Sequence, residues 1–205
     1  MNDVIHAAVR RDLTRMQEAL RAFPDGDGTR ARDLERAWDA LWAQLHHHHE
    51  GEDAHVFPYV RSLGEVDASL LDEMESEHQA MSDAMQRAGA AVAGLAASPQ
   101  RDRAVRAADA VAAAYDVTDR HLVHEETAVV PVIDAHKNSP EWKAVEKKLR
   151  VGGPRLAGDM FAWMQDGASP EVLQAIRETV PAPVLFVLTR VLGRRYHREI
   201  APIWQ

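Results

Sequence analysis

Two segments of the sequence share one pattern, His48–Val60 (HHEGEDAHVFPYV) and His121–Ile133 (HLVHEETAVVPVI). Both copies read H-x-x-x-E-[D/E]-x-x-V-x-P-x-[V/I]. On a helix, residues four positions apart lie on one face, so each copy directs an imidazole and a carboxylate to the same side. Such a pair can supply one terminal ligand and one bridging or chelating ligand to a metal ion. A single pair of this kind is usually a solvated surface feature, but two copies with the same proline offset favour a metal site.

The rest of the chain is helix-forming. Alanine, leucine, glutamate and arginine dominate, and no alternating segment rich in valine and threonine is present. Capping and loop residues divide residues 1–138 into four long helices, predicted over 3–23, 29–63, 67–97 and 99–136. Long helices with short connections predict an all-α, up-and-down four-helix bundle. Residues 139–205 contain further breaks at Gly152-Gly153-Pro154 and Asp166-Gly167. They predict several shorter helices that form a C-terminal extension packed on the bundle.

The composition restricts the classes of function. The chain has 205 residues and a mass of 22.8 kDa, enough for one large domain or one domain with an appendage. Its net charge of −8 supplies no phosphate-neutralising patch, which disfavours a nucleic-acid partner. The absence of cysteine excludes disulfides, iron–sulfur clusters and zinc–thiolate sites. Any metal must therefore be held by carboxylates and by the 11 histidines.

The C-terminal tail holds the most apolar segment. The longest apolar stretch, Pro181–Leu188, is too short to span a bilayer. No secretory signal pattern is recognisable, so we expect a cytoplasmic protein, either a monomer or a homodimer. Residues 184–192 are more apolar than one helix face needs. We expect them to pack over the bundle, with a dimer interface or a membrane-surface contact as alternatives.

The register of the repeat selects its metal ligands. His48 stands four residues before Glu52, as His121 stands before Glu125. The other pairs in the run His46–His49 do not keep the proline offset. We therefore predict His48 as the ligand of the first copy. The other histidines of the run are expected to face solvent or to support the ligands.

Helix lengths add two further histidines to this layer. Counted from the predicted helix ends at about 1.5 Å per residue, His6 and His78 lie at the level of the two repeat histidines. A lone histidine at either position would more often be a packed core or surface residue. The shared level favours a role as ligands, because a metal-free bundle would have to place four histidines in one layer by chance.

The combined pattern, H…H-x-x-x-E…H…H-x-x-x-E with a proline after each copy, resembles the hemerythrin-like HHE cation-binding family over residues 1–138. This resemblance implies a non-haem di-iron centre inside the bundle, with manganese or zinc as substitutes. It implies as ligands His6, His48, Glu52, His78, His121 and Glu125. The two glutamates would bridge the irons. The tail, with Met160–Trp163 and Arg195-Tyr196, resembles an extension of actinobacterial-type members.

The sequence departs from the oxygen-carrying hemerythrins at the third helix. Those proteins place two histidines four residues apart there, whereas Met74 stands four residues before His78 in this chain. With one histidine fewer, one iron would take a water or another protein ligand. The candidates for this role, or for hydrogen bonds that support the ligands, are His55, Tyr59, Tyr115 and His124. For His55 and Tyr59, packing at the end of the bundle is an equal alternative.

Three functions suit such a centre. The first is binding of O₂ or a related small ligand, for sensing, storage or iron handling. The second is an enzyme that removes peroxide, as a catalase does, or nitric oxide, because an exchangeable ligand position favours turnover. The third is a ferritin-like di-iron oxidase, since Glu52–His55 and Glu75–His78 both fit E-x-x-H. These two motifs fall on consecutive helices, however, which disfavours the oxidase.

Overall fold

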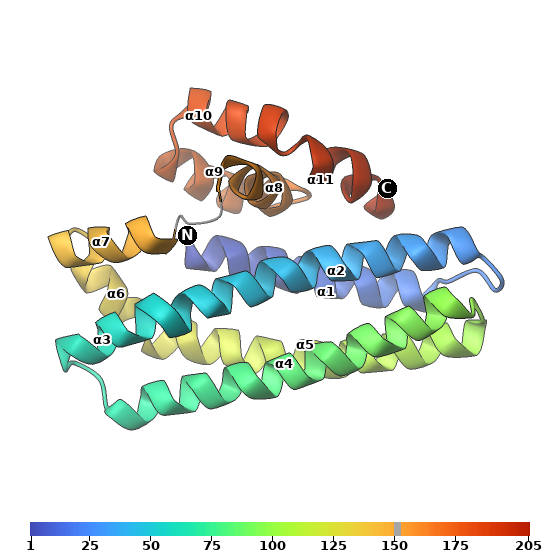
Figure 1. The fold of residues 1–205 in the computed structure, drawn as a ribbon, viewed down its shortest axis with the longest axis horizontal. Coiled ribbons are helices and arrows are strands. Elements are labelled where there is room, and N and C mark those ends of the chain that lie inside the picture. Colours follow the sequence, from blue (N-terminus) through green and yellow to red (C-terminus); the bar gives the residue numbers. More distant parts are fainter. Residues whose placement is uncertain (150–152) are drawn as a thin grey trace.

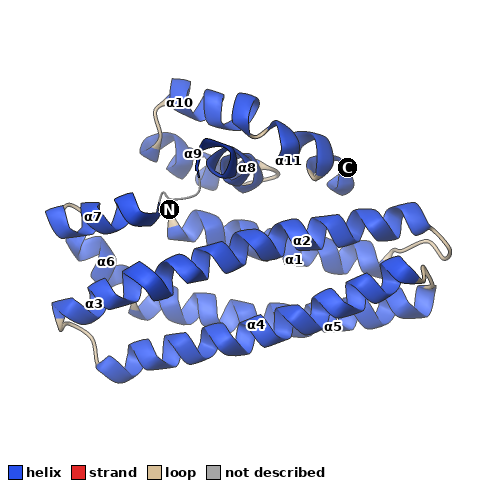
Figure 2. Cartoon of the chain, in the orientation of Figure 1, coloured by secondary structure: helices blue, strands red, loops and turns tan. Residues whose placement is uncertain are grey.

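The computed structural model describes residues 1–149 and 153–205, and within these ranges the chain is all-α, without strands (Figures 1 and 2). The N-terminal part contains α1 (Asn2–Arg21), α2 (Gly28–Gly51), the π-helix η1 (Glu52–Val56), α3 (Phe57–Leu63), α4 (Ala68–Ala97), α5 (Arg101–Ala128) and α6 (Val130–His136). The C-terminal part contains α7 (Pro140–Leu149), α8 (Gly153–Gln165), α9 (Pro170–Thr179), α10 (Ala182–Phe186), the π-helix η2 (Val187–Leu192), α11 (Arg194–Glu199) and the 3₁₀-helix η3 (Ala201–Trp204).

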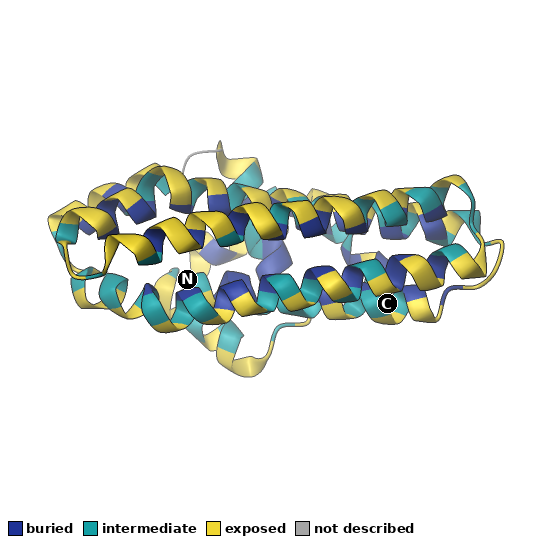
Figure 3. Cartoon of the chain, turned by 90° about the horizontal axis from the view of Figure 1, so that it is seen from below, coloured by how far each residue is buried: buried dark blue, intermediate teal, exposed yellow. Residues whose placement is uncertain are grey.

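The long helices α1, α2, α4 and α5 form the predicted bundle (Figure 1). Each packs against the next along the chain, and α5 returns to pack against α1. Their buried residues gather on the sides that face one another (Figure 3). These residues form two apolar clusters. The larger includes Met16, Leu41 and Met85, and the smaller, at the other end of the bundle, includes Phe57 and Met74.

The second and fourth predicted helices are each interrupted, which corrects the continuous helices predicted over 29–63 and 99–136. In the first copy of the repeat, α2 continues as the π-helix η1 and then as α3, which carries Pro58. In the second copy, α5 ends and α6 begins just before Pro131. Proline lacks the amide hydrogen that the helix needs, and its ring clashes with the carbonyl four residues earlier. The first interruption thus begins at the repeat carboxylate Glu52, and the second follows Glu125 at Val129.

A contact between loops sets the start of α5. The helix begins at Arg101 rather than at Pro99, and Ser98 forms the end of α4 instead. The backbone amide of Arg101 donates to Asp25 Oδ1 at 2.7 Å, from the loop between α1 and α2. The starts of α2 and α5 therefore lie at the same end of the bundle.

The C-terminal helices contact the bundle through buried polar groups on α1. Trp163 of α8 donates from Nε1 to Asp12 Oδ2 at 2.8 Å. Asp166 accepts from Arg15 Nη1 at 3.1 Å and from the Tyr196 hydroxyl at 2.9 Å. The predicted break at Gly152-Gly153-Pro154 lies partly outside the described residues, and Gly153 begins α8 with a φ of 82°.

The apolar segment 184–192 packs on one side only, where η2 contacts α8. Leu185 and Thr189 are buried, whereas Phe186 is 64% exposed. Further exposed apolar side chains on the same segment are Val184, Val187 and Val191. No single described helix combines the length and hydropathy needed to cross a membrane. Only α9 taken together with α10 and η2, bent by 115°, reaches that composition.

Candidate metal centre

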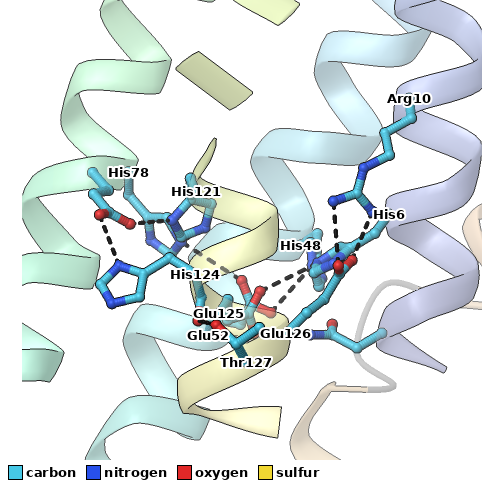
Figure 4. Close-up of polar contacts among 12 residues, drawn as sticks. His6, Arg10, His48, Glu52, His78, His121, His124, Glu125, Glu126 and Thr127 are labelled. Atoms are coloured by element: carbon cyan, nitrogen blue, oxygen red, sulfur yellow. Dashed lines mark hydrogen bonds and ion pairs between the residues drawn. The ribbon is translucent and has the colours of Figure 1, made fainter. Parts of the chain in front are cut away.

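Buried imidazoles and carboxylates form two adjacent groups between the two apolar clusters (Figure 4). The three-histidine group consists of His49, His78 and His121. The mixed group consists of His6, His48, Glu52 and Glu125. Within each group, one ligand atom of every residue lies within 4.8 Å of the others. This spacing allows each group to surround a metal ion.

The histidines of each group face one another through Nε2. His6 Nε2 and His48 Nε2 are 3.2 Å apart, and His78 Nε2 and His121 Nε2 are 3.0 Å apart. These side chains come from α1 with α2 and from α4 with α5, respectively. The four helices thus bring the predicted histidines together in one layer.

Glu52 lies between the two groups. Its Oε1 is 3.1 Å from His48 Nε2, and its Oε2 is 3.7 Å from His78 Nε2. Each oxygen therefore faces a different group, which is the arrangement that a bridging carboxylate needs. Glu125 is placed differently, because its Oε2 lies 3.2 Å from His6 Nε2 while its Oε1 accepts from Asn2 Nδ2 at 2.8 Å.

Carboxylates outside the layer orient three of the histidines. His6 Nδ1 lies 2.8 Å from Glu126, His78 Nδ1 lies 2.8 Å from Asp53, and His121 Nδ1 lies 3.0 Å from Glu77. A proton on Nδ1, donated to the carboxylate, leaves the Nε2 lone pair directed into the centre.

This geometry explains why each copy of the repeat carries two consecutive acids. The first acid, Glu52 or Glu125, points into the centre. The second acid, Asp53 or Glu126, binds the histidine of a helix that lacks a copy, α4 or α1. Arg10 holds Glu126 in turn, with Nη1 at 2.7 Å from Oε1 (Figure 4). Each copy therefore provides a group for its own interior face and a support for a neighbouring helix.

Comparison with known proteins agrees with this arrangement. Residues 3–133 match the family described as Hemerythrin HHE cation binding domain. The chain belongs to the hemerythrin HHE family. No curated protein and no solved structure matches it. The matched range of this HHE domain includes every side chain of both groups.

Burial drives His48, His49 and Glu52 of the HHE domain toward their neutral forms, whereas for Glu125 the hydrogen bond to His6 and the charge of His6 outweigh burial and lower its pKa. Burial, and then the charge of His6, lowers the pKa of His48 to about 3. Burial, and then the charge of His48, also lowers the pKa of His49. Burial, and then the charge of Glu125, raises the pKa of Glu52 well above its usual range. Neutral imidazole is the form that binds metal, and a nearby cation would restore the charged form of the carboxylate.

The donor atoms fit a bound cation. Within the described residues, His49 Nε2, Glu52 Oε2 and Glu125 Oε2 are buried without a hydrogen-bond partner. An unpaired buried polar atom costs about 1–3 kcal/mol. A metal ion would pair these atoms, and a set of imidazole nitrogens and carboxylate oxygens suits iron, manganese and zinc.

The supporting candidates differ in their positions. His124 lies 2.9 Å from Glu77, the carboxylate that also binds His121. Tyr59 is 3.3 Å from Ser139 Oγ and packs within the smaller apolar cluster. Tyr115 packs against the larger cluster, and His55 is half-buried in η1. Among the described residues, no contact joins Tyr59, Tyr115 or His55 to the inward ligand atoms.

His49 is the inward residue that sequence reasoning missed. Its ring centroid lies 4.3 Å from that of His78 and 5.4 Å from that of His121. The second copy of the repeat has Leu122 at the corresponding position, and Leu122 is fully buried. The sequence contained a signal for His49, because Leu122 is apolar at the corresponding position. An apolar residue directly after the repeat histidine indicates that this position also faces the interior.

Proposed function

We propose that this HHE domain holds two non-haem iron ions and binds O₂ or a related small ligand, for sensing, storage or iron handling. The proposal rests on the two adjacent ligand groups, with Glu52 between them. His49, His78 and His121 would hold one iron, and His6 with His48 the other. Glu125 would join His6 and His48 at the second iron, and Glu52 would be the carboxylate between the two irons.

The chain's own residues prepare the centre for a small ligand. A pair of reduced irons supplies the electrons and the coordination positions that O₂ binding requires. The outer carboxylates keep protons on the Nδ1 atoms and so fix the direction of each Nε2 lone pair. The apolar clusters on either side exclude bulk water from the layer. These features favour a small ligand over an organic substrate.

His49 changes the balance between binding and turnover. An exchangeable ligand position on one iron was expected because the third helix has one histidine fewer than in the oxygen-carrying hemerythrins. The structure directs a fifth imidazole inward from α2. That imidazole can replace the missing ligand, so the balance moves toward reversible binding.

Removal of hydrogen peroxide is the second candidate function. It is favoured by two buried oxygens without partners, Gln44 Oε1 and Thr118 Oγ1, one turn from the ligands on α2 and α5. Carriage of O₂ alone does not need such polar groups. A ferritin-like oxidase is disfavoured, since Glu75 of its second motif is exposed and lies 3.7 Å from Arg61.

Metal analysis with ultraviolet–visible spectra, before and after peroxide, tests the proposal. We expect about two irons per chain and near-ultraviolet bands of a bridged di-iron centre. His49→Ala should lower the iron content, whereas His46→Ala is the matched control, because His46 is exposed on the same helix. Iron-free protein, or equal iron content in both variants, would contradict the proposal. Rapid oxygen evolution from peroxide would favour the second candidate.

A further inference from the structure

Two buried side chains above the ligand layer carry oxygens that nothing in the described chain binds. Gln44 is 8% exposed and Thr118 is 1% exposed. Gln44 Oε1 and Thr118 Oγ1 have no hydrogen-bond partner among the described residues. A threonine in a helix commonly donates to the carbonyl four residues earlier, as Thr14 does to Arg10 at 2.9 Å. The unpaired oxygens therefore need a partner from outside the chain.

Helix register places both side chains on one side of the centre. Gln44 precedes His48 by four residues, and Thr118 precedes His121 by three, so each shares the inward face of its ligand. The starts of α2 and α5 lie at the same end of the bundle, where Asp25 binds the first amide of α5. Both oxygens are therefore displaced from the ligands toward that end.

The neighbours in this layer are apolar. Val9 follows His6 by three residues on α1, and Met81 follows His78 by three on α4. Both are buried, at 0% and 1% exposed. Because α1 and α4 run toward the same end of the bundle, these side chains complete the layer with Gln44 and Thr118. Gln44 Oε1 and Thr118 Oγ1 thus lie in a layer beside the centre whose other side chains are apolar.

We propose that Gln44 and Thr118 contact the small ligand and select for ligands that form hydrogen bonds. This inference rests on the proposed function, because it assumes a ligand at the centre. The Thr118 hydroxyl donates to an oxygen or nitrogen of the ligand, and the Gln44 carboxamide accepts from a ligand that carries a proton. Hydrogen peroxide can use both contacts, and azide can accept from Thr118. A diatomic such as nitric oxide gains little from them.

Thr118→Val tests the inference, because valine keeps the shape of threonine and removes only the hydroxyl. Iron-loaded wild type and variant are titrated with azide and with nitric oxide, and the iron content is measured. The affinity for azide should fall about 10-fold, as expected for one lost hydrogen bond, and that for nitric oxide less than about 2-fold. Thr14→Val, whose threonine bonds within α1, should leave both affinities unchanged.

The metal-free proteins give a second, independent measurement. Removing an unpaired buried hydroxyl should raise the melting temperature of Thr118→Val by about 2–4 °C. Gln44→Leu should raise it similarly and should weaken the binding of peroxide. A lower melting temperature with unchanged azide affinity would show a structural role and overturn the inference. A wild-type protein that does not hold iron would instead refute the proposed function.

Discussion

The molecule contains two buried polar clusters that differ in how far their atoms are paired. In the cluster between α1 and α8, Asp12 accepts from Trp163 and from Arg11, and Asp166 accepts from Arg15 and Tyr196. None of these groups is left without a partner. In the metal centre, inward nitrogen and oxygen atoms remain unpaired. A complete network holds elements together, whereas an incomplete one reserves its atoms for a ligand.

The largest expected effect of a substitution is on metal binding at the incompletely paired cluster. His121→Ala removes a ligand of the three-histidine group, and we expect the iron affinity to fall by more than about 100-fold. The metal-free protein should lose about 1–3 kcal/mol of stability, because the change removes the contact of His121 Nδ1 with Glu77 as well as the buried ring. Iron content and thermal unfolding measure the two effects. If the variant retained its iron but its metal-free form were strongly destabilised, the centre would have a structural role instead of a metal-binding role.

The second effect is the pH dependence of the metal-free protein. His48 has a pKa of about 3 when folded and about 6.5 when unfolded. Its contribution to stability is therefore full above pH 6.5 and is lost as the pH falls toward 3. Between pH 6.5 and 4.5 that loss is about 2 kcal/mol. The raised pKa of Glu52 acts in the opposite direction, because it stabilises the fold more as the pH falls.

Urea unfolding at several pH values separates these contributions. His48→Asn should lose less stability than wild type on acidification over this range, by about 2 kcal/mol. Parallel pH profiles for the two proteins would refute the buried neutral state of His48.

The third effect concerns the completed cluster. Asp12→Ala leaves Trp163 Nε1 and the Arg11 guanidinium without the Asp12 carboxylate, whereas Arg15 keeps its ion pair with Asp166. We expect a loss of about 2–3 kcal/mol, or about 4–12 °C in melting temperature, with unchanged iron content. Calorimetry with metal analysis measures both quantities. If iron were lost as well, the two clusters would not be independent.

The smallest expected effect concerns an outer carboxylate that supports a ligand of the centre. Asp53→Asn replaces the carboxylate that binds His78 Nδ1 and should lower the iron affinity about 10-fold. Glu50→Gln on α2 is the control, since Glu50 is exposed and pairs only with His46. Competition with a chelator gives both affinities. Equal values for the two variants would show that the outer carboxylate does not support the ligand.

The predictable part of the site lies within single helices. The spacing of His48 with Glu52, and of His121 with Glu125, follows from helical periodicity alone. Helix lengths then brought His6 to the same layer. The helical class and the bundle followed from the same patterns.

The parts that sequence reasoning missed depend on relations between helices. Asp53 and Glu126 were visible as acids, but their partners lie on α4 and α1 and cannot be found from one helix. His49 was set aside because its pair with Asp53 does not keep the proline offset. Segment 184–192 was expected to pack over the bundle, yet the side on which it packs depends on how α8 and η2 cross.

The interruptions at Pro58 and Pro131 give the two ends of the bundle different opening kinetics. Beyond the centre, α2 and α5 are continued by the short segments α3 and α6, so opening these two segments breaks few backbone hydrogen bonds. The other end consists of continuous long helices. Amide hydrogens of α3 and α6 should therefore exchange with solvent faster than those of α2 around Leu41. We therefore expect a metal ion to reach the ligand layer through the short-segment end.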